Sequence, residues 1–250
     1  MLPILQIGPV AIQMPGLILL AGVWVAVSLT DREAPRYSMK ASTLSNMILI
    51  GLVVGILSSR VWYAIRFLDI YLDNPLSLFS LNPTTLAPLE GSLTGLAAAA
   101  YYGYRKGLPL WPTLDVLTPG LAALGLAVGF AHLASGDAFG AETSLPWAIE
   151  LWGARRHPTQ IYEVLTAGFI FWLIWEIRYK TPAPGFLFLT WVALSALSRL
   201  VIEAFRGDSI IVLDSLRSAQ FSSLVVLTVA LIGMHVLVRA HTQQSQETSG

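Results

Sequence analysis

Three charged residues in one apolar segment have the spacing of a shared helix face. Arg199, Glu203 and Arg206 are separated by four and then three positions, so they would lie on one side of a helix. Ionisable side chains inside membrane spans are costly and usually mark functional sites. A guanidinium is planar and permanently charged, so it suits a phosphate. The segment therefore predicts a phospholipid headgroup site centred on Arg199.

Further polar residues are expected near the same membrane face. At least three arginines would meet in one leaflet without an equal supply of buried acids, which favours an anionic lipid as their partner. The residues predicted to bind the phospholipid are Arg60, Asp137, Arg156, His157, Glu163, Glu203 and Arg206. The simpler alternative is that they form structural ion pairs, or that arginines snorkel to headgroups.

His132 lies near the end of another apolar segment and has two interpretations. A lone histidine in such a place is usually a hydrogen-bonded packing residue. Together with His157, Asp137 and Glu163 it would offer metal ligands, but the spacing contains no helical i, i+4 ligand pair. We therefore predict neither a metal nor another cofactor.

The composition is that of a membrane protein. Of the 250 residues, 55% are hydrophobic and 12% are charged, whereas a soluble domain carries about 25% charged residues. The formal net charge is zero, so no nucleic-acid partner is predicted. Cysteine is absent, which excludes disulfides, thiolate metal sites and a cysteine nucleophile in this chain.

The hydropathy pattern predicts an all-α polytopic bundle of about seven transmembrane helices. A span needs about 20 apolar residues. The predicted spans are residues 16–29, 44–64, 89–104, 114–134, 161–179, 185–205 and 221–238. The first is short and can be extended back through Pro15 to Ile4, and Glu90-Gly91 interrupts the third. We predict a single transmembrane domain over residues 1–240 and a disordered polar tail over 241–250.

Basic residues in alternate loops predict the orientation. Lys and Arg follow the first, third, fifth and seventh spans, which places those loops in the cytoplasm and the N-terminus outside. The other side would carry a head of loops and short helices, including an interfacial helix over 67–72 and headgroup-level Trp147 and Trp152. The first apolar run lacks a basic n-region, so it is predicted to be a retained span. We expect a bacterial inner-membrane protein with its functional site toward the outer face.

One segment is specific enough to suggest a family. Arg156-His157-Pro158-Thr159-Gln160-Ile161-Tyr162-Glu163 resembles the Arg-His-Pro-(Ser/Thr)-Gln-x-Tyr-Glu segment of prolipoprotein diacylglyceryl transferases. Weaker similarities cover residues 7–16, 55–75, 90–95 and 199–206. The resemblance implies seven spans with the N-terminus outside, in agreement with the loop charges.

The resemblance also implies a reaction and its partners. Family enzymes move a diacylglyceryl group from phosphatidylglycerol to the thiol of a lipobox cysteine in a secreted prolipoprotein, and glycerol phosphate leaves. By resemblance, Arg199 is an essential-type arginine, and Arg60, His157, Glu163 and Glu203 belong to its polar shell. The implied partners are an anionic, phosphatidylglycerol-like phospholipid and a prolipoprotein signal peptide.

Several positions depart from the family pattern. In the register of the match, an arginine, an asparagine and a glutamate of the fourth span are replaced by Gly129, His132 and Asp137. The histidine of the third span is replaced by Glu90, and two tyrosines are replaced by Pro15 and Ser195.

Three hypotheses follow from these matches and departures. The first is a divergent transferase in which Arg199 keeps the phosphate, while Arg155, Arg156 or His132 takes over lost roles. The second is a paralogue for another lipid or acceptor, with Glu90 as a base because burial raises the pKa of a carboxyl. The third is a non-catalytic lipid-binding relative, an accessory subunit of a larger membrane complex. We favour a transferase with Arg199, Glu90 and His132 as catalytic residues.

Overall fold

The computed structural model describes residues 4–7, 10–79, 85–209, 211–212 and 216–247. The protein is an all-α polytopic membrane protein, and six of its described helices are long and apolar enough to cross a membrane. The chain divides into two compact units, residues 1–30 with 111–250 and residues 31–110. That the two units act as a single transmembrane domain stays a prediction. Each unit is described by itself.

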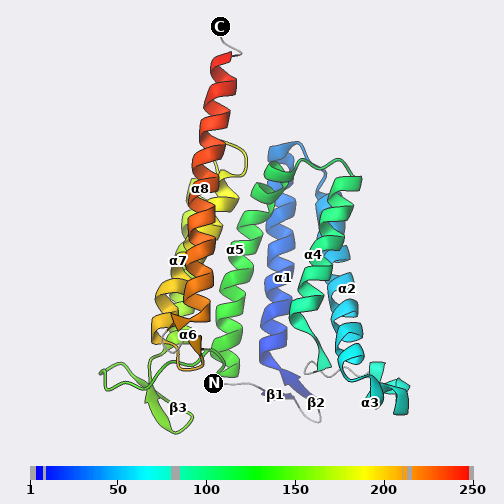
Figure 1. Ribbon diagram of the computed structural model, residues 1–250, viewed down its shortest axis with the longest axis vertical. Helices are drawn as coiled ribbons and strands as arrows, with labels where there is room; N and C mark the ends of the chain where they lie inside the picture. The colour runs from blue at the N-terminus through cyan, green and yellow to red at the C-terminus, as the bar shows by residue number, and fades with distance from the viewer. Residues whose placement is uncertain (1–3, 8–9, 80–84, 210, 213–215, 248–250) are drawn as a thin grey trace. The chain divides into compact units, whose positions relative to one another are not determined.

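The larger unit contains most of α1 and all but the first residue of α5, with α6, α7 and α8 (Figure 1). The bounds are α1 Met14–Glu33, α5 Leu110–Ser135, α6 Thr159–Ile177, α7 Phe186–Ile202 and α8 Ser218–Glu247. Helices α5, α6 and α7 share a buried apolar cluster of Ala122, Ile170, Ile174 and Leu187. This cluster holds together the three helices that carry the site.

A buried carboxylate joins the start of α7 to α5. Asp115 is 1% exposed, and its two oxygens accept the backbone N–H groups of Gly185 at 2.6 Å and Phe188 at 3.0 Å. The first N–H groups of a helix have no partner within the helix, so a side-chain oxygen from elsewhere is needed where they are buried. Asp115 therefore fixes where α7 begins, and with it the position of Arg199 along the axis of α7 relative to α5.

Replacing Asp115 by alanine should lower the free energy of unfolding by about 2–4 kcal/mol, because two buried N–H groups lose a charged acceptor. The measurement is the midpoint of thermal unfolding in detergent. Asp69→Asn, at an exposed position of the smaller unit, is the matched control and should change the midpoint little. Equal midpoints for both variants would show that the carboxylate does not anchor α7.

The smaller unit is a pair of antiparallel helices with short elements at their ends. It contains η1 Ala34–Tyr37, α2 Ala41–Arg66, α3 Leu68–Asp73, η2 Pro75–Phe79 and α4 Pro88–Arg105. Gly55 faces Gly91 and Gly95, and Gly103 lies beside Met47. These contacts follow α4 along most of its length, although it is the one predicted span that is not apolar enough to count among the candidate membrane-spanning helices. Glycines let the two backbones approach closely.

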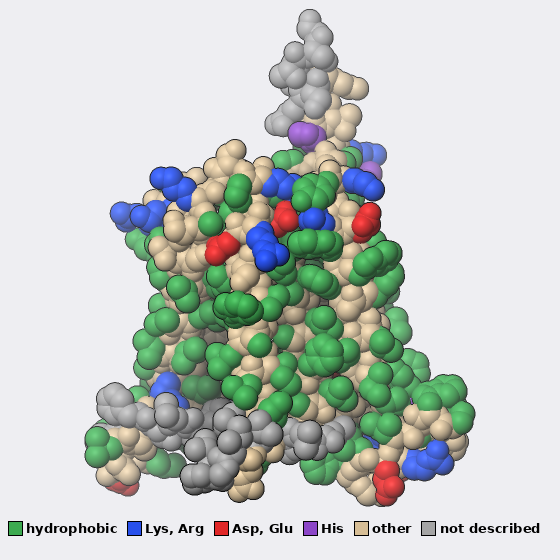
Figure 2. Space-filling view, turned by 180° about the vertical axis from the view of Figure 1, so that it is seen from behind, with side chains coloured by type: hydrophobic (Ala, Val, Ile, Leu, Met, Phe, Trp, Pro, Cys, Tyr) green, Lys and Arg blue, Asp and Glu red, His purple; other side chains and the backbone are tan. Residues whose placement is uncertain are grey.

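The predicted spans are confirmed as helices. Six of them are also apolar enough to cross a membrane, whereas α4 is not among these six. Helix α3 coincides with the predicted interfacial helix. Large apolar side chains on the spans are exposed, including Leu20, Ile56, Leu165 and Val229. On the face drawn in Figure 2, such side chains cover the middle of the helices, and charged side chains lie toward the helix ends. A lipid environment accounts for this apolar surface.

Two predictions about the chain ends differ from the structure. Ile4–Ile7 (β1) and Val10–Gln13 (β2) pair as antiparallel strands, so the first span does not extend back to Ile4. Proline lacks an N–H and suits the first turn of a helix, which explains why α1 begins beside Pro15. Helix α8 continues to Glu247 into the segment predicted as a disordered tail, since extending an existing helix adds one hydrogen bond per residue. Residues 248–250 lie outside the described residues.

Candidate functional site

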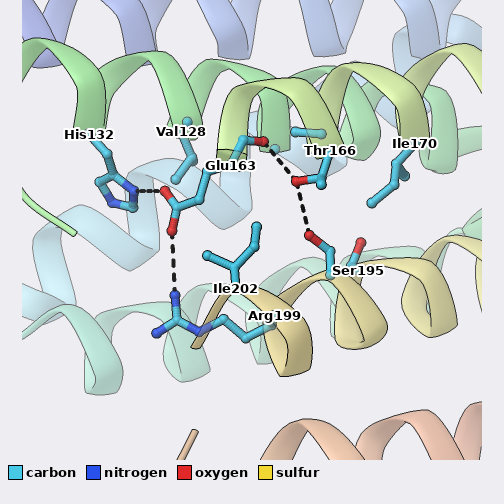
Figure 3. Close-up of a pocket in the computed structure, with 12 residues that line it drawn as sticks. Val128, His132, Glu163, Thr166, Ile170, Ser195, Arg199 and Ile202 are labelled. Atoms are coloured by element: carbon cyan, nitrogen blue, oxygen red, sulfur yellow. Dashed lines mark hydrogen bonds and ion pairs between the residues drawn. The ribbon is translucent and has the colours of Figure 1, made fainter. Parts of the chain in front are cut away.

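A cavity of about 270 Å³ lies between α5, α6 and α7 in the larger unit (Figure 3). Its polar lining comes from one face of each helix. These residues are His132 of α5, Glu163 and Thr166 of α6, and Ser195, Ser198 and Arg199 of α7. The rest of the lining is apolar and includes Val128, Ala167 and Ile170. The cavity is therefore charged at one end and apolar at the other, as an amphipathic ligand requires.

Glu163 is the centre of the charged end. Its Oε2 lies 2.7 Å from Nδ1 of His132, and its Oε1 accepts a hydrogen bond of 2.9 Å from Nη1 of Arg206. The same Oε1 lies 3.7 Å from Nη1 of Arg199. The Glu163 side chain is 14% exposed. One carboxylate thus organises a histidine and two arginines from three different elements.

The Glu163 contact decides how His132 can act. An ionised carboxylate only accepts hydrogen bonds, so Nδ1 of His132 carries the proton. In the neutral imidazole, the other ring nitrogen, Nε2, is then unprotonated and can accept a proton. The side chain is 33% exposed and lines the cavity. His132 is therefore arranged as a base whose ring is held by a carboxylate.

Arg206 follows the short helix η4 (Glu203–Phe205) and is held on several sides. Its Nε and Nη2 donate to the two Asp208 oxygens at 2.8 and 2.7 Å. Burial works against its charge, but the Asp208 hydrogen bonds and the nearby carboxylates outweigh burial and raise the pKa of the guanidinium. Burial likewise opposes the ionised Asp208, yet the Arg206 hydrogen bonds and charge hold the pKa of that carboxyl below its ordinary value. With 9% exposure, the Arg206 side chain is a structural cation.

The Asp208 pair predicts an acid-sensitive contribution to stability. A carboxyl whose pKa is lower in the folded state stabilises the fold above the ordinary value of 3.8, and this contribution is lost as the pH falls below it. Asp208→Asn should cost about 1–3 kcal/mol at pH 7, and the difference from wild type should narrow as the pH falls below 3.8. Thermal midpoints across pH 3–7 measure both, with the exposed Asp137→Asn as control. A difference that stays constant down to the lowest pH would contradict the pairing.

The Arg199 guanidinium is held by fewer contacts than that of Arg206. Its Nη2 lies 3.2 Å from Glu203 Oε2, and its side chain is 42% exposed. Within the part of the chain that the structure describes, the Arg199 guanidinium forms ion pairs but no hydrogen bond, and the Glu203 oxygen that faces it is also without one. Figure 3 shows the guanidinium at the charged end of the cavity, facing Glu163. Arg199 can therefore turn its N–H groups to a ligand.

Gly129 explains how α5 and α6 come close enough to share the cavity. It is buried, and an added Cβ would lie 3.3 Å from the backbone nitrogen of Val164. This close contact lies one turn from His132 on α5 and adjacent to Glu163 on α6. A side chain at this position would require Val164 to shift, next to the His132–Glu163 contact.

A small antiparallel sheet lies at the end of these helices that carries Glu163 and Arg206. The hairpin of β3 (Ile149–Leu151) and β4 (Ala154–Arg156) is extended by residues 139–143, which also pair with residues 205–207. An added Cβ on Gly140 would lie 2.2 Å from the His157 carbonyl oxygen, so the crossing needs a glycine. The sheet joins the loop before α6 to the turn after α7. It thereby fixes Glu163 and Arg206 relative to each other.

Comparison with known proteins shows to which family the chain belongs. Residues 3–236 match the family model described as prolipoprotein diacylglyceryl transferase. A phosphatidylglycerol–prolipoprotein diacylglyceryl transferase of Shouchella clausii is 32% identical over 250 residues, which cover 94% of this chain and 88% of that protein. The chain belongs to the prolipoprotein diacylglyceryl transferase family. Enzymes of the same name from Streptococcus pneumoniae and Trichormus variabilis are 30% and 29% identical, over 94% and 92% of this chain and 91% and 87% of their own length.

The site of this family member gathers five of the predicted residues. Arg199, Glu163, His132, Glu203 and Arg206 form one connected network. The expectation of arginines without matching acids is wrong, because two guanidinium groups meet three carboxylates once Asp208 is included. Asp208 was missed in the sequence because it lies beyond the span, although its position two residues after Arg206 is a usable signal.

Three other predicted residues lie near the network without joining it. Arg156 donates to the backbone oxygens of Leu151 and Gly140 at 3.1 and 3.3 Å and pairs with Glu142, so it holds the sheet together. His157 stacks against Phe205 with ring centroids 5.2 Å apart. The Asp137 side chain is exposed, and its backbone oxygen accepts a hydrogen bond from Gln160. Their predicted part in phospholipid binding stays a prediction.

Arg60 and Glu90 belong to the smaller unit. There Glu90 forms an ion pair with Arg66, and Arg60 hydrogen-bonds to Thr85. The predicted base of the third span is therefore engaged by a neighbouring arginine. The catalytic part of Glu90 and the lipid-binding part of Arg60 stay predictions.

Proposed function

We propose that this chain transfers the diacylglyceryl group of phosphatidylglycerol to the thiol of a lipobox cysteine in a prolipoprotein. The observation that carries the proposal is the cavity that places the available guanidinium of Arg199 beside the His132–Glu163 pair. The names of the relatives support the two substrates. The comparisons lend no support to a non-catalytic accessory subunit.

Arg199 is the proposed phosphate ligand. Its N–H groups are unclaimed by hydrogen bonds from the described residues, whereas Arg206 uses its own on Glu163 and Asp208. A guanidinium donates two parallel hydrogen bonds to a phosphate, and in a site shielded from water these bonds strengthen as the leaving group gains charge. Arg199 therefore binds the lipid headgroup and stabilises the departing glycerol phosphate.

His132 is the proposed base. Nε2 of the imidazole takes the proton of the cysteine thiol, because Nδ1 already carries a proton directed at Glu163. The Glu163 carboxylate, which contacts Nδ1, stabilises the imidazolium that forms. This arrangement would supply in α5 and α6 the base that the family pattern has in its third span.

The reaction balances with these groups alone. The thiol loses its proton to His132, and the sulfur forms a bond to the glyceryl carbon that carried the phosphate. The carbon–oxygen bond to the phosphate breaks, and glycerol phosphate leaves with the bonding electrons while Arg199 holds its charge. The product is a thioether-linked diacylglyceryl cysteine.

The proposed location is the bacterial inner membrane, with the cavity toward the outer face. In the larger unit, Arg178 and Lys180 lie in the loop that leads to Gly185. Gly185 lies against Trp111 at the start of α5 and Leu237 near the end of α8. Arg178, Lys180 and Arg239 therefore lie at the same end of the helices. His132, Glu163 and Arg206 lie at the opposite end of the same helices. Basic loops favour the cytoplasm, which puts the charged end of the cavity outside.

The proposal is tested with the purified full chain in proteoliposomes. We expect a synthetic lipobox peptide to gain the mass of one diacylglyceryl group when the vesicles contain phosphatidylglycerol, with glycerol phosphate released in equal amount. Vesicles of phosphatidylethanolamine alone serve as the control. A folded, monodisperse protein that leaves the peptide mass unchanged in both lipids would refute the transferase activity.

A further inference from the structure

Many hydroxyl groups of the membrane helices donate a hydrogen bond to a backbone carbonyl of their own helix. Thr118, Thr190 and Thr228 each donate to the carbonyl oxygen four residues earlier, at 2.7–2.9 Å. Thr166 does the same with Tyr162 at 2.8 Å, and Ser198 donates to Thr166 at 3.1 Å. Such bonds are expected, because nothing else in a hydrocarbon surrounding accepts a hydroxyl hydrogen.

Among the described hydroxyl groups that line the cavity, Ser195 lacks such a bond. Its hydroxyl has no hydrogen-bond partner in the described part of the chain, although Ser195 lies in the middle of α7 and is half-buried. It lines the cavity beside Ser198, and in Figure 3 its side chain faces across the cavity toward α6. An unpaired hydroxyl directed into an otherwise apolar part of a cavity points to an acceptor on the ligand.

The position of Ser195 relative to Arg199 identifies the acceptor. The two residues are four apart on α7, so Ser195 lies one turn, about 6 Å, deeper in the membrane. In a glycerophospholipid the ester carbonyls also lie just below the phosphate, separated from it by the glycerol carbons. At the level of Ser195 and beyond it, the lining includes Gly125, Ala167 and Ile170, which suits the acyl chains that follow the esters.

We propose that the Ser195 hydroxyl donates a hydrogen bond to an ester carbonyl oxygen of the lipid whose phosphate Arg199 holds. This inference rests on the proposed function and adds a substrate specificity to it. An ether-linked lipid has the same headgroup and glycerol but no carbonyl oxygen, so it cannot form this bond equally well. The cavity therefore selects diacyl glycerolipids over dialkyl glycerolipids.

The test compares two phosphatidylglycerols that differ only in linkage, diester and diether, with matched chain lengths. Each competes for the full chain in phosphatidylcholine nanodiscs, and bound lipid is counted by native mass spectrometry. We expect wild type to prefer the diester about 5- to 10-fold, the effect of one hydrogen bond. Ser195→Ala should reduce this preference to less than about 2-fold by weakening diester binding alone.

Two features of the design separate the possible causes. Unchanged diether binding by Ser195→Ala would show that the cavity is intact, and Thr228→Ala, on the exposed face of α8, should keep the wild-type preference. Equal binding of both lipids by wild type, or an unaltered preference in Ser195→Ala, would overturn the inference while the transferase proposal stands. If neither lipid binds, both the Ser195 inference and the proposed transferase function are refuted. If the diester preference depends on Ser195 but no peptide is modified, only the transfer reaction is refuted.

Discussion

Replacing Arg199 by alanine is expected to lower diacylglyceryl transfer about 100- to 1,000-fold while the protein stays folded. The guanidinium is the proposed phosphate ligand of the cavity, and its side chain is 42% exposed, with ion pairs but no hydrogen bond to the described residues. Its loss removes charge stabilisation, while Glu163 and Glu203 keep Arg206 as their ion-pair partner. Transfer to a lipobox peptide in phosphatidylglycerol proteoliposomes measures the effect.

Two further variants make the Arg199 result specific. Arg199→Lys should recover only part of the activity, since an ammonium cannot donate two parallel hydrogen bonds to a phosphate. Lys180→Ala removes one positive charge from a 75% exposed position and should transfer at the wild-type rate. Wild-type turnover by Arg199→Ala would show that the phosphate is bound elsewhere.

Replacing Glu163 by glutamine is expected to lower the turnover number about 100- to 10,000-fold, the usual contribution of a positioned base. The carboxylate holds Nδ1 of His132 at 2.7 Å and faces both arginines. An amide of the same size cannot compensate their charge, and it can present its NH₂ group to the imidazole, which favours the wrong tautomer. The turnover number should therefore fall more than the Michaelis constant for the lipid rises.

The matched control for Glu163 is Glu142→Gln. Glu142 is also an acid that pairs with an arginine of this unit, but its side chain is 71% exposed. We expect it to change neither turnover nor the thermal midpoint noticeably, since exposed ion pairs contribute little. If Glu163→Gln turned over like Glu142→Gln, the carboxylate would be structural and His132 would not depend on it.

The membrane fold was accessible from the sequence because its cause is local. Long apolar runs must form helices in a membrane, where each backbone group needs a partner within its own segment. All the predicted spans are helices for this reason. Ile4–Ile7 and Val10–Gln13 are apolar as well, yet they pair with each other as strands. Short apolar runs satisfy their backbone in either way, so hydropathy did not distinguish them.

The site was accessible only as a set of residues. The spacing of Arg199, Glu203 and Arg206 and the segment from Arg156 to Glu163 pointed to the right family and to most of the network. The sequence did not show which role each residue of this set has. Arg156 and Arg206 look equivalent to Arg199 in the sequence, but their donors are taken by carbonyl oxygens and by Asp208.

The predicted phosphate site at Arg199 is therefore sharpened by tertiary structure. The sequence by itself determined the spans and the residue types that a lipid-handling site needs, because hydrophobicity and charge are properties of each residue. Only the folded chain decided which arginine has unclaimed donors, which carboxylate holds His132 and which hydroxyl is left unpaired in the cavity. Hydrogen bonds depend on distances between residues far apart in the chain, and no local pattern specifies those distances.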